Sequence, residues 1–244
     1  MPWRTEPLAL VTGVARLGAG WVRLLRQNGW QVAYCWHQTP PTELETLTQA
    51  QPELVQGFQC DLEQPYSAGE LFDQATYWAG KTPSFVLHAA SRWFNDTVTD
   101  VTEESWFTSL RLQAWPLAAW TRQLLAAGTP ASLLTVLDSR TSASTPNEFS
   151  YGWGKRLAAG LVADLARQAA PLVRVNGLAL GPVLPPTGGE PRWESWVKAL
   201  PLGVQPPLNE VDQALLFLLN SNSVTGEILH IDGGASLLRR EQTL

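Results

Sequence analysis

The sequence is poor in the residues that build metal centres. Its 244 residues include only two cysteines and three histidines, and these are scattered along the chain. None has the spacing of a metal site, and Cys35 and Cys60 lie at the ends of predicted strands. We therefore expect no bound metal and interpret both cysteines as buried free thiols.

Positive charge and long apolar runs are also scarce. The net charge of −5 argues against a nucleic-acid-binding surface. No apolar stretch approaches the roughly 20 residues of a membrane span, and the first residues carry no apolar signal core. Because 45% of the residues are apolar, disorder is excluded. We expect a soluble, cytoplasmic protein with one domain over residues 1–244.

The strongest single pattern lies between Leu8 and Gly20. An apolar run over 8–11 predicts a buried strand, and an apolar side over 19–28 predicts a helix. The glycine-bearing turn 12–18 joins them. A strand that turns tightly into a helix offers backbone N–H groups and a positive dipole end to a phosphate. We interpret the turn as a dinucleotide-binding site, although a glycine-rich turn that binds nothing has the same pattern.

Strand and helix patterns alternate along the rest of the chain, at the spacing of βα units. This spacing predicts a doubly wound α/β fold with a parallel sheet. Strands are predicted over 30–36, 54–60, 83–88, 132–137, 173–180 and 227–231. Helices are predicted over 42–50, 67–79, 100–127 with an interruption near Pro116, 149–170 and 209–220.

A stretch rich in proline, glycine and tryptophan, 183–207, follows the sixth predicted strand. Ligands bind beyond the carboxyl ends of strands in this architecture, so we expect the stretch to form a substrate-covering lobe. Its Trp193 and Trp196 are equally consistent with closing over a substrate and with packing at a subunit interface.

The second predicted strand ends at Trp36 without the carboxylate that NAD enzymes usually place there for the ribose 2′-hydroxyl. An absent carboxylate admits a 2′-phosphate. His37, Gln38 and Thr39 can form hydrogen bonds to that phosphate, and Arg16 in the first turn can pair with it. We therefore predict NADPH as the cofactor. The alternative for Arg16 is a solvated turn residue.

Tyr151 and Lys155 are four residues apart, which places them on one face of a predicted helix. A nearby ammonium lowers the pKa of a tyrosine, and such a tyrosine can give a proton to a carbonyl oxygen or an imine nitrogen. The same spacing is common among surface helix residues. Here, however, it follows the fifth strand of a predicted dinucleotide-binding fold.

Together these features resemble the short-chain dehydrogenase/reductase family along nearly the whole chain. The motifs that carry the resemblance are Thr12-Gly13, Asp61-Leu62, Tyr151 with Lys155, Gly181-Pro182 and Asp232-Gly233-Gly234. The resemblance implies a Rossmann-like sheet of seven parallel strands with helices on both faces. It implies an NADP(H) site formed by Gly13, Arg16, Leu17, Gly18, His37, Gln38, Thr39, Asp61, Leu62, Ala90, Ser91, Tyr151, Lys155, Gly181, Pro182 and Val183.

Within that site, Asp61 resembles the residue that bonds the adenine edge, and Gly181-Pro182 resembles the loop beside the nicotinamide. The family also implies a homotetramer or dimer. By the same resemblance, the long helix and the helix over 149–170 form the subunit contact.

A closer resemblance is to the pteridine reductases, a subgroup that includes dihydromonapterin reductase and uses NADPH. Asp138 stands thirteen residues before Tyr151, where most of the family has serine, and 90–93 is similar to the subgroup's Ala-Ser-x-aromatic. In the subgroup the aromatic ring stacks on the pterin and the aspartate joins the active tyrosine. The catalytic set implied is Tyr151, Lys155 and Asp138. The substrate-binding set is Arg16, Ser91, Trp93, Asp138 and Tyr151.

Three of these residues can instead have purely structural roles. The alternative for Trp93 is a core residue, for Asp138 a cap on the following turn, and for Ser91 the end of a strand. The chain also departs from the family, because Leu112 or Gln113 occupies the region where a helix asparagine usually holds a water for proton relay.

The leading hypothesis is an NADPH-dependent pteridine reductase that transfers hydride to a C=N bond of a dihydropterin, with protonation by Tyr151. One alternative is an NADPH-dependent carbonyl reductase acting on 3-oxoacyl thioesters. Asp138 and Trp93 argue against it, because an acyl chain needs neither a flat aromatic face nor an extra carboxylate. The other is a non-catalytic NADP-binding sensor, against which the intact Tyr151–Lys155 pair argues.

Overall fold

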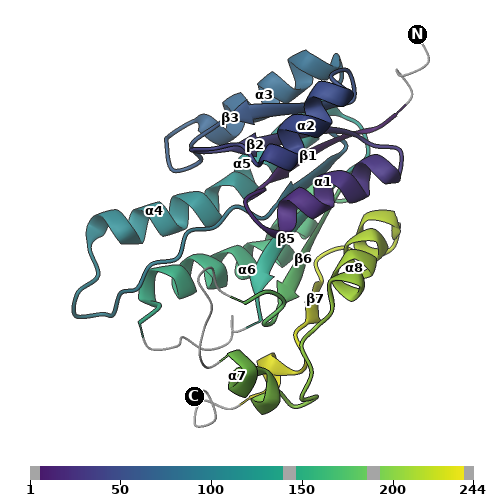
Figure 1. The fold of residues 1–244 in the computed structure, drawn as a ribbon. Helices are drawn as coiled ribbons and strands as arrows, with labels where there is room; N and C mark the ends of the chain where they lie inside the picture. Colours follow the sequence, from purple (N-terminus) through teal and green to yellow (C-terminus); the bar gives the residue numbers. More distant parts are fainter. Residues whose placement is uncertain (1–5, 140–146, 186–192, 239–244) are drawn as a thin grey trace.

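A sheet of seven strands forms the centre of the computed structural model, in the order β3-β2-β1-β4-β5-β6-β7 (Figure 1). Residues 6–139, 147–185 and 193–238 are described by the structure. All neighbouring strands are parallel, which confirms the predicted doubly wound, Rossmann-like fold. The strands are β1 (Leu8–Thr12), β2 (Gln31–Trp36), β3 (Val55–Gln59), β4 (Phe85–His88), β5 (Ala131–Asp138), β6 (Val173–Leu180) and β7 (Ile228–Ile231).

Helices cover both faces of the sheet. One layer contains α1 (Leu17–Gln27), α2 (Thr42–Ala50) and α8 (Leu208–Asn220). The other contains α3 (Ser67–Ala79), α4 (Glu103–Gln113), α5 (Trp115–Ala127) and α6 (Phe149–Ala169). Short α7 (Trp193–Ala199) lies near the end of β7, and a 3-10 helix, Ala235–Leu237, follows that strand (Figure 1).

Strand β1 shows how the sequence builds these two layers. Leu8 and Leu10 join the core under α3, α5 and α6, whereas Ala9 and Val11 join the core under α1 and α8. Successive side chains of a strand point to opposite faces, so a fully apolar run suits a strand covered on both sides. The sheet is therefore held between two apolar layers, and its carboxyl edge is left for polar residues.

Most predicted boundaries agree with the structure within about two residues. The long helical pattern divides at Ala114, and Pro116 lies in the first turn of α5, where its missing N–H is no loss. Helix α4 begins later than predicted because Thr102 and Ser105 form a capping box. Helix α7, inside the predicted lobe, was not predicted as a helix.

The two cysteines are free thiols, as expected, but only Cys35 is buried, so full burial was wrong for Cys60. Within the described ranges, no group of three or more histidine, cysteine, aspartate or glutamate side chains is arranged to hold a metal. None of the helices in those ranges is both long and apolar enough to cross a bilayer. Between β5 and α6, residues 140–146 lie outside the described residues.

Candidate active site

A cavity of about 390 Å³ lies at the carboxyl edge of the sheet, beyond the ends of β1, β4, β5 and β6. This edge is where open α/β sheets bind ligands. Residues from the first turn, from the segments after β4 and β6, and from α6 line the cavity together. They are Gly13, Ala15, Arg16, Leu17, Trp21, Ala89, Ser91, Trp93, Val136, Leu137, Asp138, Tyr151, Lys155, Leu180, Gly181, Val183 and Leu184.

The turn between β1 and α1 requires its glycines. Gly13 has φ +76°, and a Cβ there would lie 2.3 Å from the carbonyl carbon of Ala89. A Cβ on Gly18 would lie 2.6 Å from the Gly13 carbonyl oxygen. Only glycine therefore allows the first turn of α1 to close onto the end of β1. This leaves the amino end of α1 at the cavity, an arrangement that fits a dinucleotide pyrophosphate.

A buried histidine joins the first turn to β4 and α4. Burial, reinforced by the positive charge of Lys155, lowers the pKa of His88 to about 3, so the imidazole is neutral. Its Nε2 lies 3.0 Å from the Leu112 carbonyl oxygen and its Nδ1 lies 2.9 Å from Thr12 Oγ1. A neutral ring therefore donates from Nε2 and accepts the threonine proton at Nδ1. Thr12 Oγ1 in turn accepts the Ala89 and Ala90 amides, which fixes the backbone leading to Ser91.

Three polar side chains meet where β5 and α6 approach each other. Tyr151 Oη donates to Asp138 Oδ2 at 3.3 Å, and Lys155 Nζ donates to the Val136 carbonyl at 2.9 Å. The ammonium lies 5.9 Å from the centre of the Tyr151 ring. Burial lowers the pKa of Lys155 to about 8, while the charge of Asp138 acts to raise it. A phenol hydroxyl, a carboxylate and a buried ammonium thus meet at one wall of the cavity, and groups of this kind can move a proton.

The indole of Trp93 packs against the ring of Tyr151. The two ring centres are 4.9 Å apart at a tilt of 39°, and Trp93 remains 53% exposed. A core position for Trp93 is therefore excluded. Ser91 lies three residues beyond the end of β4 and also lines the cavity, so it does not end the strand.

Arg16 connects the first turn to the segment after β6. Its Nη2 donates to the Pro185 carbonyl at 2.6 Å, across the cavity that both Arg16 and Val183 line. Arg16 is therefore exposed, as a solvated turn residue would be, but it also lines the cavity and forms a hydrogen bond to Pro185.

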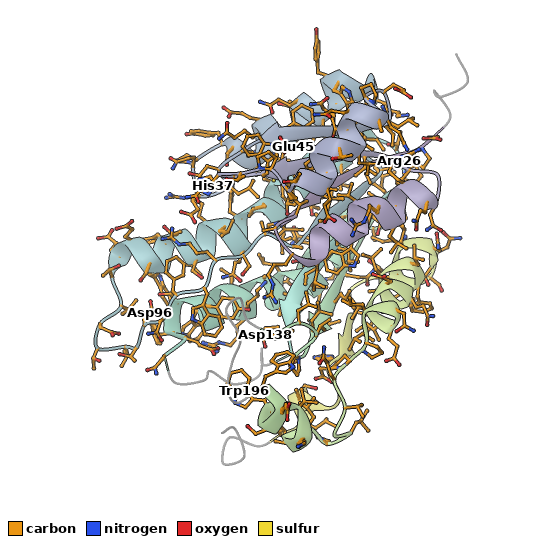
Figure 2. The ribbon with its side chains drawn as sticks, viewed as in Figure 1. Arg26, His37, Glu45, Asp96, Asp138 and Trp196 are labelled. Carbon is orange, nitrogen blue, oxygen red and sulfur yellow. The ribbon has the colours of Figure 1, made fainter. Side chains whose placement is uncertain are left out.

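The predicted 2′-phosphate site lies elsewhere on the same edge. His37, Gln38 and Thr39 are exposed and do not line the cavity, and β1 and β4 separate their strand from β5. In Figure 2 the labelled His37 and Asp138 lie well apart. His37 Nε2 is 3.7 Å from Asp61 Oδ2. Although burial acts to raise the pKa of Asp61, hydrogen bonds from Gln64 and the Glu63 amide and nearby positive charge lower it.

Comparison with known proteins identifies the family. A family model described as "Enoyl-(Acyl carrier protein) reductase" matches residues 13–236, nearly the whole chain. The chain belongs to the short-chain dehydrogenase/reductase family. This is a family of NAD(P)-dependent oxidoreductases, in agreement with the resemblance in the motifs of the chain.

Curated relatives match over a shorter segment. "Carbonyl reductase family member 4" from Xenopus laevis is 36% identical over 88 residues, which is 36% of this chain and 37% of that protein. The Danio rerio protein of the same name is 38% identical over 89 residues, which is 36% of this chain and 38% of that protein. The match thus spans little more than a third of these relatives.

Solved structures match over the whole fold. FolM alternative dihydrofolate reductase 1 from Brucella canis, solved in complex with NADP, is 26% identical with a TM-score of 0.86, and the match covers 96% of both chains. The Brucella suis protein, also in complex with NADP, is 26% identical with a TM-score of 0.85, and the match again covers 96% of both chains. A blue fluorescent protein from a metagenomic library, in complex with NADPH, shares the fold at 21% identity, a TM-score of 0.83 and coverage of 93% and 97%.

In this member of the family, several cavity residues were not anticipated from the sequence. Trp21 is one of them; its Nε1 donates to Asp212 Oδ1 at 3.0 Å, which joins α1 to α8. Leu62, predicted at the cofactor, is buried in the core, and Pro182 does not line the cavity. Gln113, in the region of the usual helix asparagine, is buried and donates to Ser109 Oγ at 2.9 Å. Trp21 was missed because the sequence marks it only as an apolar helix residue, and such a residue shows no local sign of facing a cavity.

Proposed function

We propose that the chain is an NADPH-dependent pteridine reductase acting on a dihydropterin C=N bond. The observation that carries this proposal is that a half-exposed Trp93 ring and the Asp138 carboxylate both contact Tyr151 in one cavity. A flat aromatic face suits a flat heterocycle, and a carboxylate beside the phenol suits protonation of a ring nitrogen. Similarity to FolM alternative dihydrofolate reductase 1 supports the same substrate class.

The residues present fit the cofactor. Gly13 and Gly18 form the close turn at the amino end of α1, which would hold the pyrophosphate. Asp61 would bond the adenine edge, and His37, Gln38 and Thr39 would hold a 2′-phosphate. Gly181, Pro182 and Val183 would lie beside the nicotinamide. NADPH, when bound, supplies the hydride.

The chain's own residues would manage the proton. Tyr151 gives its phenolic proton to the substrate nitrogen, and the buried Lys155 ammonium stabilises the phenolate that remains. Asp138 accepts the Tyr151 hydroxyl and orients it. Ser91 and Arg16 lie on the cavity wall, where they would bond the substrate. The described parts of the predicted lobe, 183–185 and 193–207, would cover it, and residues 186–192 of that lobe lie outside the described residues.

The second candidate is a carbonyl reductase of the 3-oxoacyl thioester type, favoured by the match to carbonyl reductase family member 4. Tyr151 and Lys155 serve that reaction equally well. Trp93 and Asp138 distinguish the two candidates, because a linear acyl chain uses neither.

We also propose that α4 and α6 form the contact of a homotetramer. Large apolar side chains remain exposed on these two helices, namely Phe107, Trp153 and Leu157. Light scattering on a size-exclusion column measures the assembly, and Trp153→Glu is expected to reduce its mass.

The test of the proposed activity is NADPH oxidation with dihydrobiopterin and an acetoacetyl thioester side by side. Trp93→Ala is expected to raise the KM for the pterin about tenfold, the upper range for an aromatic stack, and Asp138→Ser to lower pterin turnover at least about tenfold. Preference for the thioester, with Asp138→Ser harmless, would instead establish the carbonyl reductase. NADPH binding without turnover of either substrate would support a sensor.

A further inference from the structure

Asp96 lies in the segment 89–102 between β4 and α4, outside the set of residues that line the cavity. It is only 7% exposed, although acidic residues are rarely buried without partners. Figure 2 shows it beside the beginning of α6, the helix that carries Tyr151.

Its hydrogen bonds all reach the first residues of α6 or the first turn of α4. Oδ1 accepts the Ser150 amide at 2.9 Å, and Oδ2 accepts the Ser150 hydroxyl at 2.5 Å and the Ser105 hydroxyl at 3.0 Å. The Asp96 carbonyl accepts the Phe149 amide at 2.9 Å. Asp96 therefore acts as the N-terminal cap of α6, supplied from a distant segment. A negative charge there is also favoured by the helix dipole.

Ser150, directly before Tyr151, is bonded at every polar group. Besides the two bonds from its amide and hydroxyl, its carbonyl accepts the Ser109 hydroxyl of α4 at 2.7 Å. Ser150 and Ser109 are both fully buried. Because buried bonds of this kind are costly to break, the backbone that enters Tyr151 has one position relative to α4.

The same segment contacts Tyr151 directly, since Trp93 precedes Asp96 by three residues and its ring packs against the Tyr151 ring at a tilt of 39°. We propose that Asp96 is a positioning residue: it fixes the first turn of α6 to the segment 89–102, so that the phenol of Tyr151 and the ring of Trp93 keep one geometry. This rests on Tyr151 as the proton donor, part of the proposed function, but not on the pterin as substrate.

The experiment compares Asp96→Ala and Asp96→Asn with Asp100→Ala. Asp100 is a matched control in the same segment, because its exposed carboxylate bonds only Thr97. NADPH oxidation is measured with whichever of dihydrobiopterin and the acetoacetyl thioester the wild type reduces. A misplacement of about 1 Å can cost about 100-fold, so Asp96→Ala is expected to lower kcat about 100-fold with the KM for NADPH within about twofold.

Asp96→Asn is expected to stay within about fivefold of the wild type, because its amide can accept the Ser150 N–H and donate to the serine hydroxyl. Asp100→Ala should match the wild type. The proposal is overturned if Asp96→Ala keeps its kcat. It is also overturned if, in both Asp96 variants, kcat and the unfolding midpoint fall while the KM for NADPH rises, which is the result of a merely structural role.

Amide hydrogen exchange gives a result even if neither substrate is reduced, and so separates this proposal from the substrate assignment. In Asp96→Ala the amides of Phe149 and Ser150 are expected to exchange at least about tenfold faster, while those of β1 and α1 stay unchanged. Unchanged exchange at Phe149 and Ser150, or faster exchange throughout the chain, would overturn it.

Discussion

The two ends of the sheet's carboxyl edge differ in how firmly they hold their polar groups. At the proposed proton-transfer end, formed by Asp138, Tyr151 and Lys155, the lysine is buried and the side chains are bonded to one another or to β5. At the proposed adenosine end, formed by 37–39 and Asp61, the side chains of 37–39 are exposed and the His37–Asp61 pair is 3.7 Å apart.

We attribute this difference in burial and bonding to the proposed roles of the two ends, proton transfer and nucleotide binding. Proton transfer needs groups held in place in a low-dielectric setting, where a charge acts strongly on its neighbour. A nucleotide phosphate is bound by charge and hydrogen bonds that can remain solvated, and exposed pairs contribute little energy each. Substitutions should therefore have large effects at the proton-transfer end and graded effects at the adenosine end.

The largest effect is expected from Tyr151→Phe. Loss of the phenolic proton should lower kcat by about 1000-fold, while NADPH affinity stays within about threefold, because the ring and its packing remain. Steady-state kinetics and NADPH fluorescence measure the two quantities. Tyr77→Phe is the control, since Tyr77 is 92% exposed on α3 and should have no effect. Retention of a tenth of the wild-type kcat would place the proton donor elsewhere.

The next effect concerns the pH dependence of stability, tested with Lys155→Met. The folded pKa of Lys155 is about 8, below its ordinary 10.5, so burial of its charge costs stability in full below pH 8. As the pH rises from about 8 to 10.5, the folded state releases its proton before the unfolded state, and this cost disappears. The wild type should therefore gain stability relative to Lys155→Met by on the order of 3 kcal/mol over this window.

Urea unfolding of both proteins from pH 7 to 10.5 measures this difference. Lys198→Met, at an exposed position on α7, should show no such pH-dependent difference from the wild type. A constant difference between the wild type and Lys155→Met would mean that Lys155 keeps its proton throughout and is better solvated than its burial indicates.

The smallest effect is expected at the adenosine end. Gln38→Arg should raise the preference for NADPH over NADH by about tenfold, because a guanidinium adds a charge-assisted hydrogen bond to the 2′-phosphate. The ratio of kcat/KM for the two cofactors measures it, and kcat should not change. If Gln38→Arg has no effect but Arg16→Gln lowers the preference for NADPH, the 2′-phosphate lies at Arg16. Cofactor selection would then depend on a residue of the cavity and not on 37–39.

Much of the fold could be predicted because its signals are local. The apolar run of β1 and the proline of α5 each specify structure within a few residues. The capping box at Thr102 is also local but was not recognised, so α4 was predicted to begin too early. The pair Tyr151 and Lys155 was found for the same reason, since helical spacing alone places them on one face. Helix α7 was missed because the surrounding prolines and glycines hide its short pattern.

The sequence by itself determined the order of strands and helices, the glycine turn at Gly13 and the family motifs, because these depend on residues close in the chain. Only the tertiary structure decided which distant groups meet. It brought Trp93 onto Tyr151, gave Arg16 a partner at Pro185, buried Lys155 enough to lower its pKa, and capped α6 with Asp96. The physical reason is that hydrogen bonding, burial and ring contact depend on distance in space, which the packing of the layers sets.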